Sequence, residues 1–264
     1  MTRIKERTEE AIREAANFFS DSVLDKKTIS KKGYANFVTE IDYKVQDFLQ
    51  NKLTEIIPGS NIITEESTDN IYKLEKPTWI VDPVDGTTNL MYSYQHSAIS
   101  VALILDGEPY MGFIYDPALK EMFFAENGKG AYLNDEIINV SQNEILEDCL
   151  MGFGTTPYDR TKAEATFELV KNVFVRCRDV RRSGSAALDM AYVACGRMDG
   201  FFEMTLQPWD FAAGFIIINE AMGKTTDWHD QTLNLISPGS IISTNKLIHK
   251  EMIDILCTSL GDER

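Results

Sequence analysis

Four acidic side chains are the residues of this sequence best suited to carry chemistry, because each lies where a short structural segment begins or ends. They are Glu65, Asp82, Asp85 and Asp210. Three of them follow predicted strands, and the last opens a predicted helix. Carboxylates at this density repel one another unless cations lie among them. We therefore predict that these side chains converge on divalent metal ions.

The ligands of such a site would all be oxygen atoms. The sequence has three histidines, none spaced as a metal-binding pair, and its four cysteines form no C-x-x-C pair. Oxygen ligands favour Mg²⁺, with Mn²⁺ as the alternative, over Zn²⁺. We expect the histidines to be surface or packing residues and the cysteines to be reduced and mostly buried. These residues are His96, His229, His249, Cys149, Cys177, Cys195 and Cys257.

The segment that begins at Asp82 reads Asp-Pro-Val-Asp-Gly-Thr-Thr-Asn and joins metal ligands to anion ligands in one turn. Pro83 stiffens the bend, which lets Asp82 and Asp85 turn toward one point. Gly86 permits a close approach of the backbone, so the amides of Gly86 and Thr87 could hold phosphate oxygens. The plain alternative is that Asp-Pro and Asp-Gly only form a turn, as they do in many loops.

Two separate motifs resemble those of the inositol monophosphatase family. Residues 82–89 are similar to the first family motif, and residues 209–214, Trp-Asp-Phe-Ala-Ala-Gly, are similar to the second, in the expected order. The resemblance extends over nearly the whole chain and includes Asp42, Glu65, Glu66, residues 184–187 and Glu203. It implies an α+β layered sandwich of the αβαβα type, as in inositol monophosphatases and fructose-1,6-bisphosphatases.

The resemblance also implies a role for each site residue. The metal ligands would be Glu65, Asp82, the carbonyl of Val84, Asp85 and Asp210, with Asp82 bridging two of two or three Mg²⁺ ions. Glu65 and Thr87 would orient the attacking water, with Asp42 behind Thr87. The substrate contacts would be Asp85, Gly86, Thr87, Gly184, Ser185, Ala186, Glu203 and Asp210. Lys31 or Lys32 would lie near the metals.

Three positions depart from the family pattern. Thr64 stands where the family commonly has Gly, and Tyr92 and Gln95 stand where His and Pro are often found. None of them is an expected metal ligand, so they bear on substrate preference rather than on catalysis.

The resemblance predicts a lithium-sensitive, Mg²⁺-dependent phosphatase, commonly a homodimer, that hydrolyses inositol monophosphate or a related sugar phosphate with a metal-activated water. Fructose 1,6-bisphosphate, adenosine 3′,5′-bisphosphate and NADP are alternative substrates of this fold. Non-catalytic binding of metal ions or polyanions is an alternative function. Aspartyl-phosphate phosphatases need an Asp-x-Asp pattern after a strand, whereas here the spacing is from Asp82 to Asp85.

The composition argues against several kinds of partner. The 264 residues include 41 acidic and 26 basic ones, for a formal charge of −15, and no basic run with aromatic residues interrupts this excess. We therefore expect no nucleic-acid partner. Residues 1–19 mix charged and apolar residues like an amphipathic helix, and the apolar run at residues 211–218 is far shorter than the roughly 20 residues of a membrane span. We expect a cytoplasmic protein that binds no membrane.

The length of the chain and the absence of a Pro/Gly/Ser-rich linker predict one catalytic unit at residues 1–264, with compact subdomains at roughly 1–140 and 141–264. Helices are expected at residues 39–56, 163–174, 185–194 and 209–222, and from 246 onward. Strands are expected at residues 61–64, 78–81, 97–105, 110–115, 121–125, 131–133, 200–203, 224–227 and 240–243, the middle ones antiparallel. We expect the basic cluster of Arg178, Arg181 and Arg182 to be solvated surface.

Overall fold

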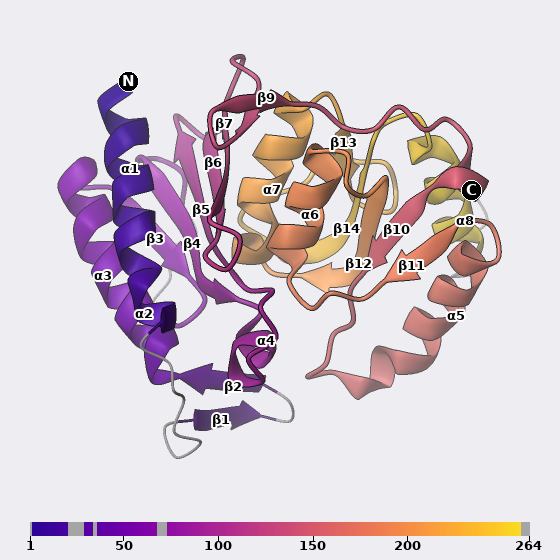
Figure 1. The fold of residues 1–264 in the computed structure, drawn as a ribbon, viewed down its shortest axis with the longest axis horizontal. Helices are drawn as coiled ribbons and strands as arrows, with labels where there is room; N and C mark the ends of the chain where they lie inside the picture. Colours follow the sequence, from indigo (N-terminus) through magenta and orange to yellow (C-terminus); the bar gives the residue numbers. More distant parts are fainter. Residues whose placement is uncertain (1, 21–28, 34–35, 68–72, 260–264) are drawn as a thin grey trace.

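Helical layers and sheets alternate in the computed structural model, which describes residues 2–20, 29–33, 36–67 and 73–259 (Figure 1). The outer helices on the side of the first sheet are α1 (Thr2–Ala15) and α3 (Glu40–Ile56). The inner helices, which lie between the two main sheets, are α6 (Ala186–Ala194) and α7 (Pro208–Glu220). The outer helices on the side of the second sheet are α5 (Ala163–Phe174) and α8 (His249–Ser259). The expected αβαβα sandwich is confirmed.

The first main sheet has seven strands in the order β3-β4-β5-β6-β7-β8-β9. Its strands are β3 (Asn61–Thr64), β4 (Thr78–Asp85), β5 (Ala98–Leu105), β6 (Glu108–Asp116), β7 (Glu121–Glu126), β8 (Ala131–Leu133) and β9 (Glu136–Ile138). Only β3 and β4 pair in parallel, and the remaining pairs are antiparallel. The expected antiparallel middle region is confirmed, and β9 extends it by one strand.

The second main sheet has five strands in the order β11-β10-β12-β14-β13. Its strands are β10 (Leu150–Phe153), β11 (Asp179–Arg181), β12 (Gly200–Leu206), β13 (Lys224–Thr226) and β14 (Gly239–Thr244). The sequence prediction missed β10 and β11. The first is interrupted by Gly152, a residue type that is depleted in strands, and the second is a polar edge strand without an apolar pattern.

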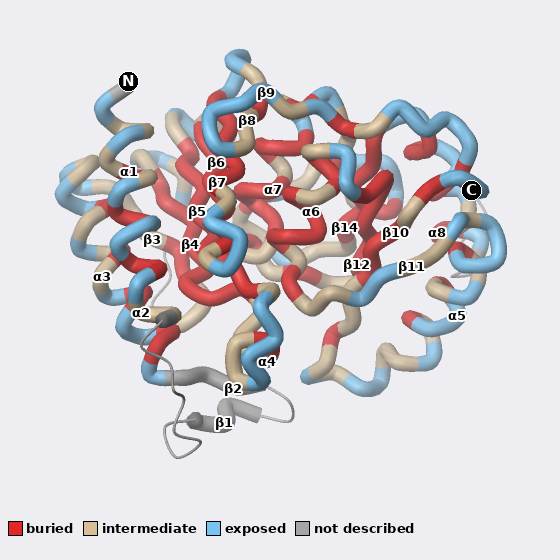
Figure 2. The backbone as a smooth tube through the Cα atoms, viewed as in Figure 1, coloured by how far each residue is buried: buried red, intermediate tan, exposed pale blue. Residues whose placement is uncertain are grey.

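Helix α7 is buried on nearly all sides because it lies between the two sheets (Figure 2). This burial explains the continuous apolar run at residues 211–218. The helix also comes very close to β6: a Cβ atom at Gly112 would lie 2.6 Å from the carbonyl oxygen of Ala213. Close packing on a sheet fixes the helix axis, and with it the N-terminal turn that carries Asp210.

Small elements complete the chain. They are α2 (Asn17–Ser20), β1 (Ile29–Gly33), β2 (Asn36–Thr39), α4 (Thr87–Met91) and two 3₁₀ turns, η2 (Leu146–Asp148) and η3 (Arg160–Lys162). Lys31 and Lys32 belong to β1, but their side chains lie outside the described part of the structure, so their expected place near the metals stays a prediction. The division into subdomains also stays a prediction. No described helix is long and apolar enough to cross a bilayer.

Candidate active site

Three carboxylates meet at one end of the first main sheet. Asp82 and Asp85 come from the end of β4, and Asp210 comes from the first turn of α7. One ligand oxygen from each lies within 4.8 Å of the other two. Asp82 and Asp85 are buried, and Asp210 is half-buried. We call these three residues the aspartate triad.

A β-bulge brings the two aspartates of β4 to the same point. On a regular strand, residues three positions apart face opposite sides of the sheet. Here Asp82 pairs with Ser100 of β5 and Asp85 pairs with Ala98, so three steps along β4 match two along β5. One extra residue on β4 turns the second carboxylate toward the first. The expected turn is therefore a bulged strand instead, since β4 continues to Asp85.

Glu65 approaches the triad from the neighbouring strand. Strands β3 and β4 run parallel with Thr64 opposite Val81, so the next residue on each segment, Glu65 after β3 and Asp82 within β4, follows side by side with the other. Burial raises the pKa of Asp82 most, and the charge of Glu65 is the next cause. Glu65 is half-buried. Glu65 therefore lies beside the triad and lines the same cavity, and its role as a metal ligand stays a prediction.

One oxygen of each triad carboxylate accepts a backbone N–H. The pairs are Asp82 with the N–H of Val84 at 2.9 Å, Asp85 with that of Ala187 at 2.7 Å, and Asp210 with that of Gln207 at 2.7 Å. An ionised carboxylate has about four lone-pair sites, so these bonds fix its orientation and leave acceptor capacity for a cation.

The electrostatics of the triad fit bound cations. Burial raises the pKa of Asp82 and of Asp210 well above the ordinary range, and neighbouring carboxylates raise both further. Burial also raises the pKa of Asp85 to about 6, against the hydrogen bond that the Ser185 hydroxyl donates to it. Divalent cations would relieve this cost of ionisation, and an all-oxygen donor set suits Mg²⁺.

Thr87 and Asp42 form a hydrogen-bonded pair beside the triad. Thr87 begins α4 after Gly86, whose φ of 92° is in the left-handed region. Its Oγ1 lies 3.0 Å from Oδ1 of the fully buried Asp42 and 3.1 Å from the carbonyl oxygen of Val84. The hydroxyl has one proton, so donating it to Asp42 leaves its lone pairs free to accept a hydrogen bond from a water.

The facing wall of the site comes from the second half of the chain. Glu203 on β12 is buried, and burial raises its pKa to about 8. Its carboxylate lies against Gly154, where a Cβ atom would stand only 1.7 Å from Oε2. Gly184, Ser185 and Ala186 line the same cavity. The structure thus places all the expected substrate contacts around one cavity of about 330 Å³.

Several other cavity residues were not predicted as site residues. Those with polar side chains outside the first motif and the turn after it are Thr155, Tyr158, Arg160, Arg182 and Asp189. Thr155, Tyr158 and Arg160 belong to the segment after β10, a strand that was not predicted from the sequence. Asp189 belongs to α6, where no local sequence pattern marks it as a cavity residue. Burial raises the pKa of Asp189 to about 8. Arg182 was expected on the solvated surface, and that prediction was incomplete because this exposed side chain also lines the cavity.

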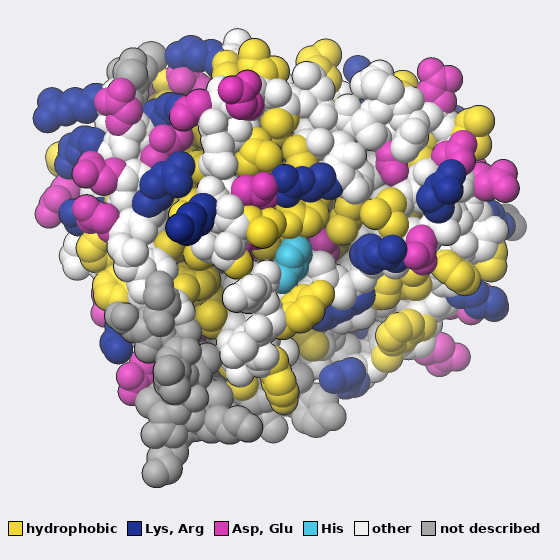
Figure 3. Space-filling model, in the orientation of Figure 1, with side chains coloured by type: hydrophobic (Ala, Val, Ile, Leu, Met, Phe, Trp, Pro, Cys, Tyr) yellow, Lys and Arg dark blue, Asp and Glu magenta, His cyan; other side chains and the backbone are white. Residues whose placement is uncertain are grey.

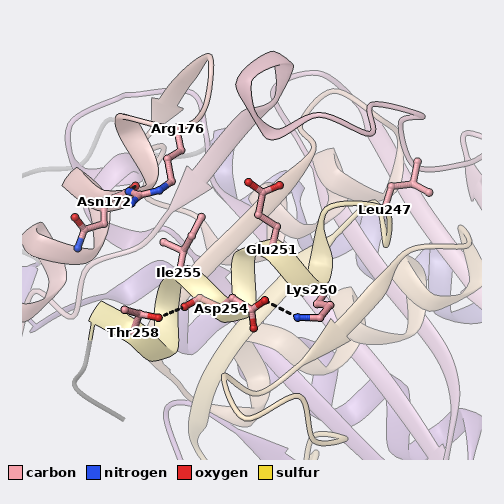
Figure 4. Close-up of a pocket in the computed structure, with 8 residues that line it drawn as sticks. All are labelled: Asn172, Arg176, Leu247, Lys250, Glu251, Asp254, Ile255 and Thr258. Atoms are coloured by element: carbon pink, nitrogen blue, oxygen red, sulfur yellow. Dashed lines mark hydrogen bonds and ion pairs between the residues drawn. The ribbon is translucent and has the colours of Figure 1, made fainter. Parts of the chain in front are cut away.

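A groove of about 670 Å³ lies between α5 and α8 (Figure 4). Lys250 lies 2.5 Å from the Asp254 carboxylate there, and the Thr258 hydroxyl donates to the Asp254 carbonyl. Among the described residues, this groove brings together no group of acids close enough to share an ion. On the face drawn in Figure 3, basic side chains lie interspersed with acidic ones, and the expected absence of a nucleic-acid partner stays a prediction.

Comparisons with known proteins place this geometry in context. Residues 2–260 match the model of the inositol monophosphatase family. A Nus factor SuhB of Escherichia coli is 35% identical over 254 residues, which are 96% of this chain and 95% of that protein. A fructose-1,6-bisphosphatase/inositol-1-monophosphatase of Thermotoga maritima is 38% identical over 226 residues, 86% of this chain and 84% of that protein. The structure of a Thermotoga maritima IMPase superposes with a TM-score of 0.89 at 33% identity and covers 99% of both chains.

Proposed function

Because the chain belongs to the inositol monophosphatase family, we propose that it is a Mg²⁺-dependent phosphatase that hydrolyses a small phosphate monoester. The observation that carries the proposal is the aspartate triad, which adjoins the hydrogen-bonded pair of Thr87 and Asp42. Among the described residues, the triad is the one group of three or more His, Cys, Asp or Glu close enough to share an ion. Candidate metal ligands and a hydroxyl that can accept a hydrogen bond from water thus line one cavity.

The metal ligands would come from two elements of the first sheet and one inner helix. We assign them as Glu65, Asp82, the carbonyl of Val84, Asp85 and Asp210. Bound Mg²⁺ would acidify a water molecule and neutralise charge on the phosphoryl group. Binding of the substrate also needs the cation, since the carboxylates that line the cavity would otherwise repel a dianionic ester.

Thr87 would set the direction of the attacking water. Its proton would go to Oδ1 of Asp42, because the Val84 carbonyl, the other acceptor within reach, would bind the metal ion, so Oγ1 would accept from the water. Glu65 would accept the other hydrogen bond and take up the proton. No covalent bond between the protein and phosphate is needed in this scheme.

The substrate would lie between the two walls of the cavity. The amides of Gly86 and Thr87 would hold phosphoryl oxygens, while Glu203 and the segment from Gly184 to Ala186 would contact the alcohol. We propose inositol monophosphate or a related sugar phosphate as substrate. The names of the relatives leave this choice open, since one names two phosphatase activities and others name a Nus factor.

Phosphate release tests the proposal. Purified protein should release phosphate from inositol 1-phosphate or from a sugar monophosphate in Mg²⁺, and EDTA should stop the release. No release from these esters or from adenosine 3′,5′-bisphosphate and NADP would instead favour a non-catalytic protein that binds metal ions or polyanions. Inhibition by Li⁺ and sedimentation as a homodimer are further expectations of the family assignment.

A further inference from the structure

Two short segments that are far apart in the sequence lie against each other beside the aspartate triad. They are residues 85–89, which run from β4 into α4, and residues 183–185, which lead into α6. Each has a glycine in the left-handed region, Gly86 with a φ of 92° and Gly184 with a φ of 95°. A Cβ atom at Gly86 would stand 3.2 Å from the carbonyl oxygen of Gly184, so the two backbones touch. We call residues 85–89 and 183–185 the paired segments.

Side chains join the paired segments at both ends. At one end, the Ser185 hydroxyl donates to Oδ2 of Asp85 at 2.5 Å. At the other end, the Asn89 side-chain amide donates to the carbonyl oxygen of Ser183 at 3.0 Å, across 94 positions of the sequence. The two segments and their two end bonds therefore form a closed frame around the glycines.

The Asn89 amide is buried and uses both of its protons. Asn89 is 8% exposed and is not among the residues that line the cavity. Its Nδ2 donates a second hydrogen bond, to the carbonyl oxygen of His96 at 2.7 Å. Both partners are carbonyl oxygens, which only accept, so the NH₂ group must face them. Asn89 is therefore built to hold backbone segments in place and not to meet a ligand.

The frame ends on a candidate metal ligand. Ser185 is the N-cap of α6, where its Oγ accepts from the N–H of Leu188 at 3.3 Å while its proton goes to Asp85. The N–H of Ala187 donates to the same Oδ2 of Asp85 at 2.7 Å. Both bonds leave Oδ1 of Asp85 for a cation. The direction of Oδ1 thus depends on where the start of α6 lies relative to β4.

We propose that Asn89 is a positioning residue of the metal site, whose amide holds residues 183–185 in place so that Ser185 and Ala187 direct Asp85 toward the ions. This inference rests on the proposed phosphatase function. Asn89 itself would touch neither an ion nor the substrate. A ligand must be held within about 0.5 Å of its productive position, so loss of the amide should weaken the binding of ions.

Asn89→Leu tests the hydrogen bonds apart from the shape, because leucine has the branching of asparagine but donates nothing. We expect the Kd for Mn²⁺, used as a probe and measured by calorimetry, to rise about tenfold. Asn245→Leu is the matched control. Asn245 is also buried, and its Nδ2 also donates twice, to Oγ of Ser141 at 3.0 Å and to the carbonyl of Asn143 at 2.8 Å, but away from the cavity. Its replacement should leave the Kd for Mn²⁺ unchanged.

A double-mutant cycle with Ser185→Ala tests the route from Asn89 to Asp85. Ser185→Ala alone should also raise the Kd for Mn²⁺ about tenfold, because it removes one of the bonds that orient Asp85. If both side chains act through one frame, the double variant should bind Mn²⁺ no more than about thirtyfold more weakly than wild type, and not about a hundredfold. Independent effects of a hundredfold would contradict the frame.

The Mg²⁺ requirement of the reaction separates positioning from a loss of active protein. In Asn89→Leu, the Mg²⁺ concentration for half-maximal phosphate release should rise about tenfold, and kcat at saturating Mg²⁺ should recover to within about threefold of wild type. Inactive protein in the sample would lower the rate at every Mg²⁺ concentration without moving this midpoint.

Two further results would overturn the inference. One is an unchanged Kd for Mn²⁺ in Asn89→Leu that is folded by near-UV circular dichroism. The other is an equal loss of affinity in Asn89→Leu and Asn245→Leu, since both asparagines would then only stabilise the fold. If a leucine variant does not fold, alanine at both positions gives the same comparison. If wild type binds Mn²⁺ but hydrolyses no ester, the phosphatase proposal fails alone, and the Mn²⁺ affinities still decide the role of Asn89.

Discussion

The two walls of the cavity are built in different ways. The metal wall carries the aspartate triad, Thr87 and Glu65. Each triad carboxylate has an oxygen fixed by a backbone N–H, and two of the three aspartates belong to one short motif. The alcohol wall faces the triad and carries Glu203, Gly154 and Arg182. Glu203 accepts no hydrogen bond that the structure records for the described residues, and Arg182 makes a single one. The first wall is preorganised for ions, and the second keeps polar capacity for a substrate.

Because of this difference, we expect the metal wall to control the reaction and the alcohol wall to control which substrate is preferred. Changes on the metal wall should abolish turnover for every substrate, because they remove the means of holding ions and water. Changes on the alcohol wall should alter which ester is used, and by smaller factors, because each contact there is one of several. Effects should therefore decrease from changes on the metal wall to changes on the alcohol wall.

The largest effect is expected for Asp82→Asn. Asp82 lies at the centre of the metal wall, and its amide replacement loses the charge that a divalent ion needs. We expect kcat to fall by at least about a thousandfold for all substrates. Phosphate release in Mg²⁺ measures this effect, and near-UV circular dichroism checks that the fold survives.

Asp106→Asn is the matched control for this change. Asp106 is an aspartate in the exposed turn between β5 and β6 and lies outside the cavity. Its replacement should leave turnover unchanged. Full activity of the Asp82 variant would mean that the reaction takes place elsewhere.

Thr87→Val should have the next largest effect. The variant keeps the shape of the side chain but loses the hydroxyl that accepts from the water, so we expect a loss of about a hundredfold in kcat. Affinity for Mn²⁺, used as a probe and measured by calorimetry, should change little. Asp42→Asn should act through the same hydroxyl, so the double variant should lose less than the sum of both free-energy changes. Additive losses would contradict a coupled pair.

Much of the metal wall could be predicted from sequence because its signals are local. The predicted strand at residues 61–64 coincides with β3, and the predicted helix at residues 209–222 overlaps α7, which carries Asp210. The motif from Asp82 to Thr87 also carries its chemistry in consecutive residues. The bulge in β4 could not be predicted, since it depends on pairing with β5, and only the structure reveals the extra residue.

Much of the alcohol wall depends on tertiary pairing. Strands β10 and β12 run parallel with Phe153 opposite Phe202, which brings Gly154 against Glu203. These residues are about fifty positions apart, and β10 gives no period of its own. Arg182 looked like its exposed neighbour Arg181 in sequence, and only the turn at Gly184 and the partner Thr155 set it apart. Local patterns cannot carry such information.

Ionisation of the metal-wall carboxylates should lower the free energy of unfolding of the metal-free protein in a pH-dependent way. The pKa of Asp85 rises from 3.8 to about 6, so the folded state holds this proton more tightly than the unfolded state does. The contribution of Asp85 to stability is therefore lost as pH rises from about 4 through 6, and it changes little above that. In EDTA, Asp85→Asn should be more stable than wild type by on the order of 2 kcal/mol above pH 7, and by little at pH 4.

Urea unfolding of both proteins across this pH range measures the difference. Comparing the two proteins cancels groups that titrate alike in both, such as His249, whose pKa burial lowers to about 4. The charge of Asp85 raises the pKa values of Asp210 and Glu203, so its removal also lowers their cost of ionisation and adds to the advantage of the variant at high pH. Saturating Mg²⁺ should reverse the order, because it binds the folded wild type more tightly than the variant. A constant difference between pH 4 and 8 in EDTA would show that Asp85 carries no such cost.

The smallest effect is expected for Gly154→Ala on the alcohol wall. The added methyl would overlap the Glu203 carboxylate, so that side chain must move while the metal ligands stay in place. We expect kcat/KM for a polyol monophosphate to fall about tenfold, as in Glu203→Gln, and the double variant to fall little further. Gly239→Ala is the matched control, since a Cβ there meets no atom within 4 Å. An equal loss in both alanine variants, or a loss of Mn²⁺ affinity in Gly154→Ala, would mean that the two walls are not independent.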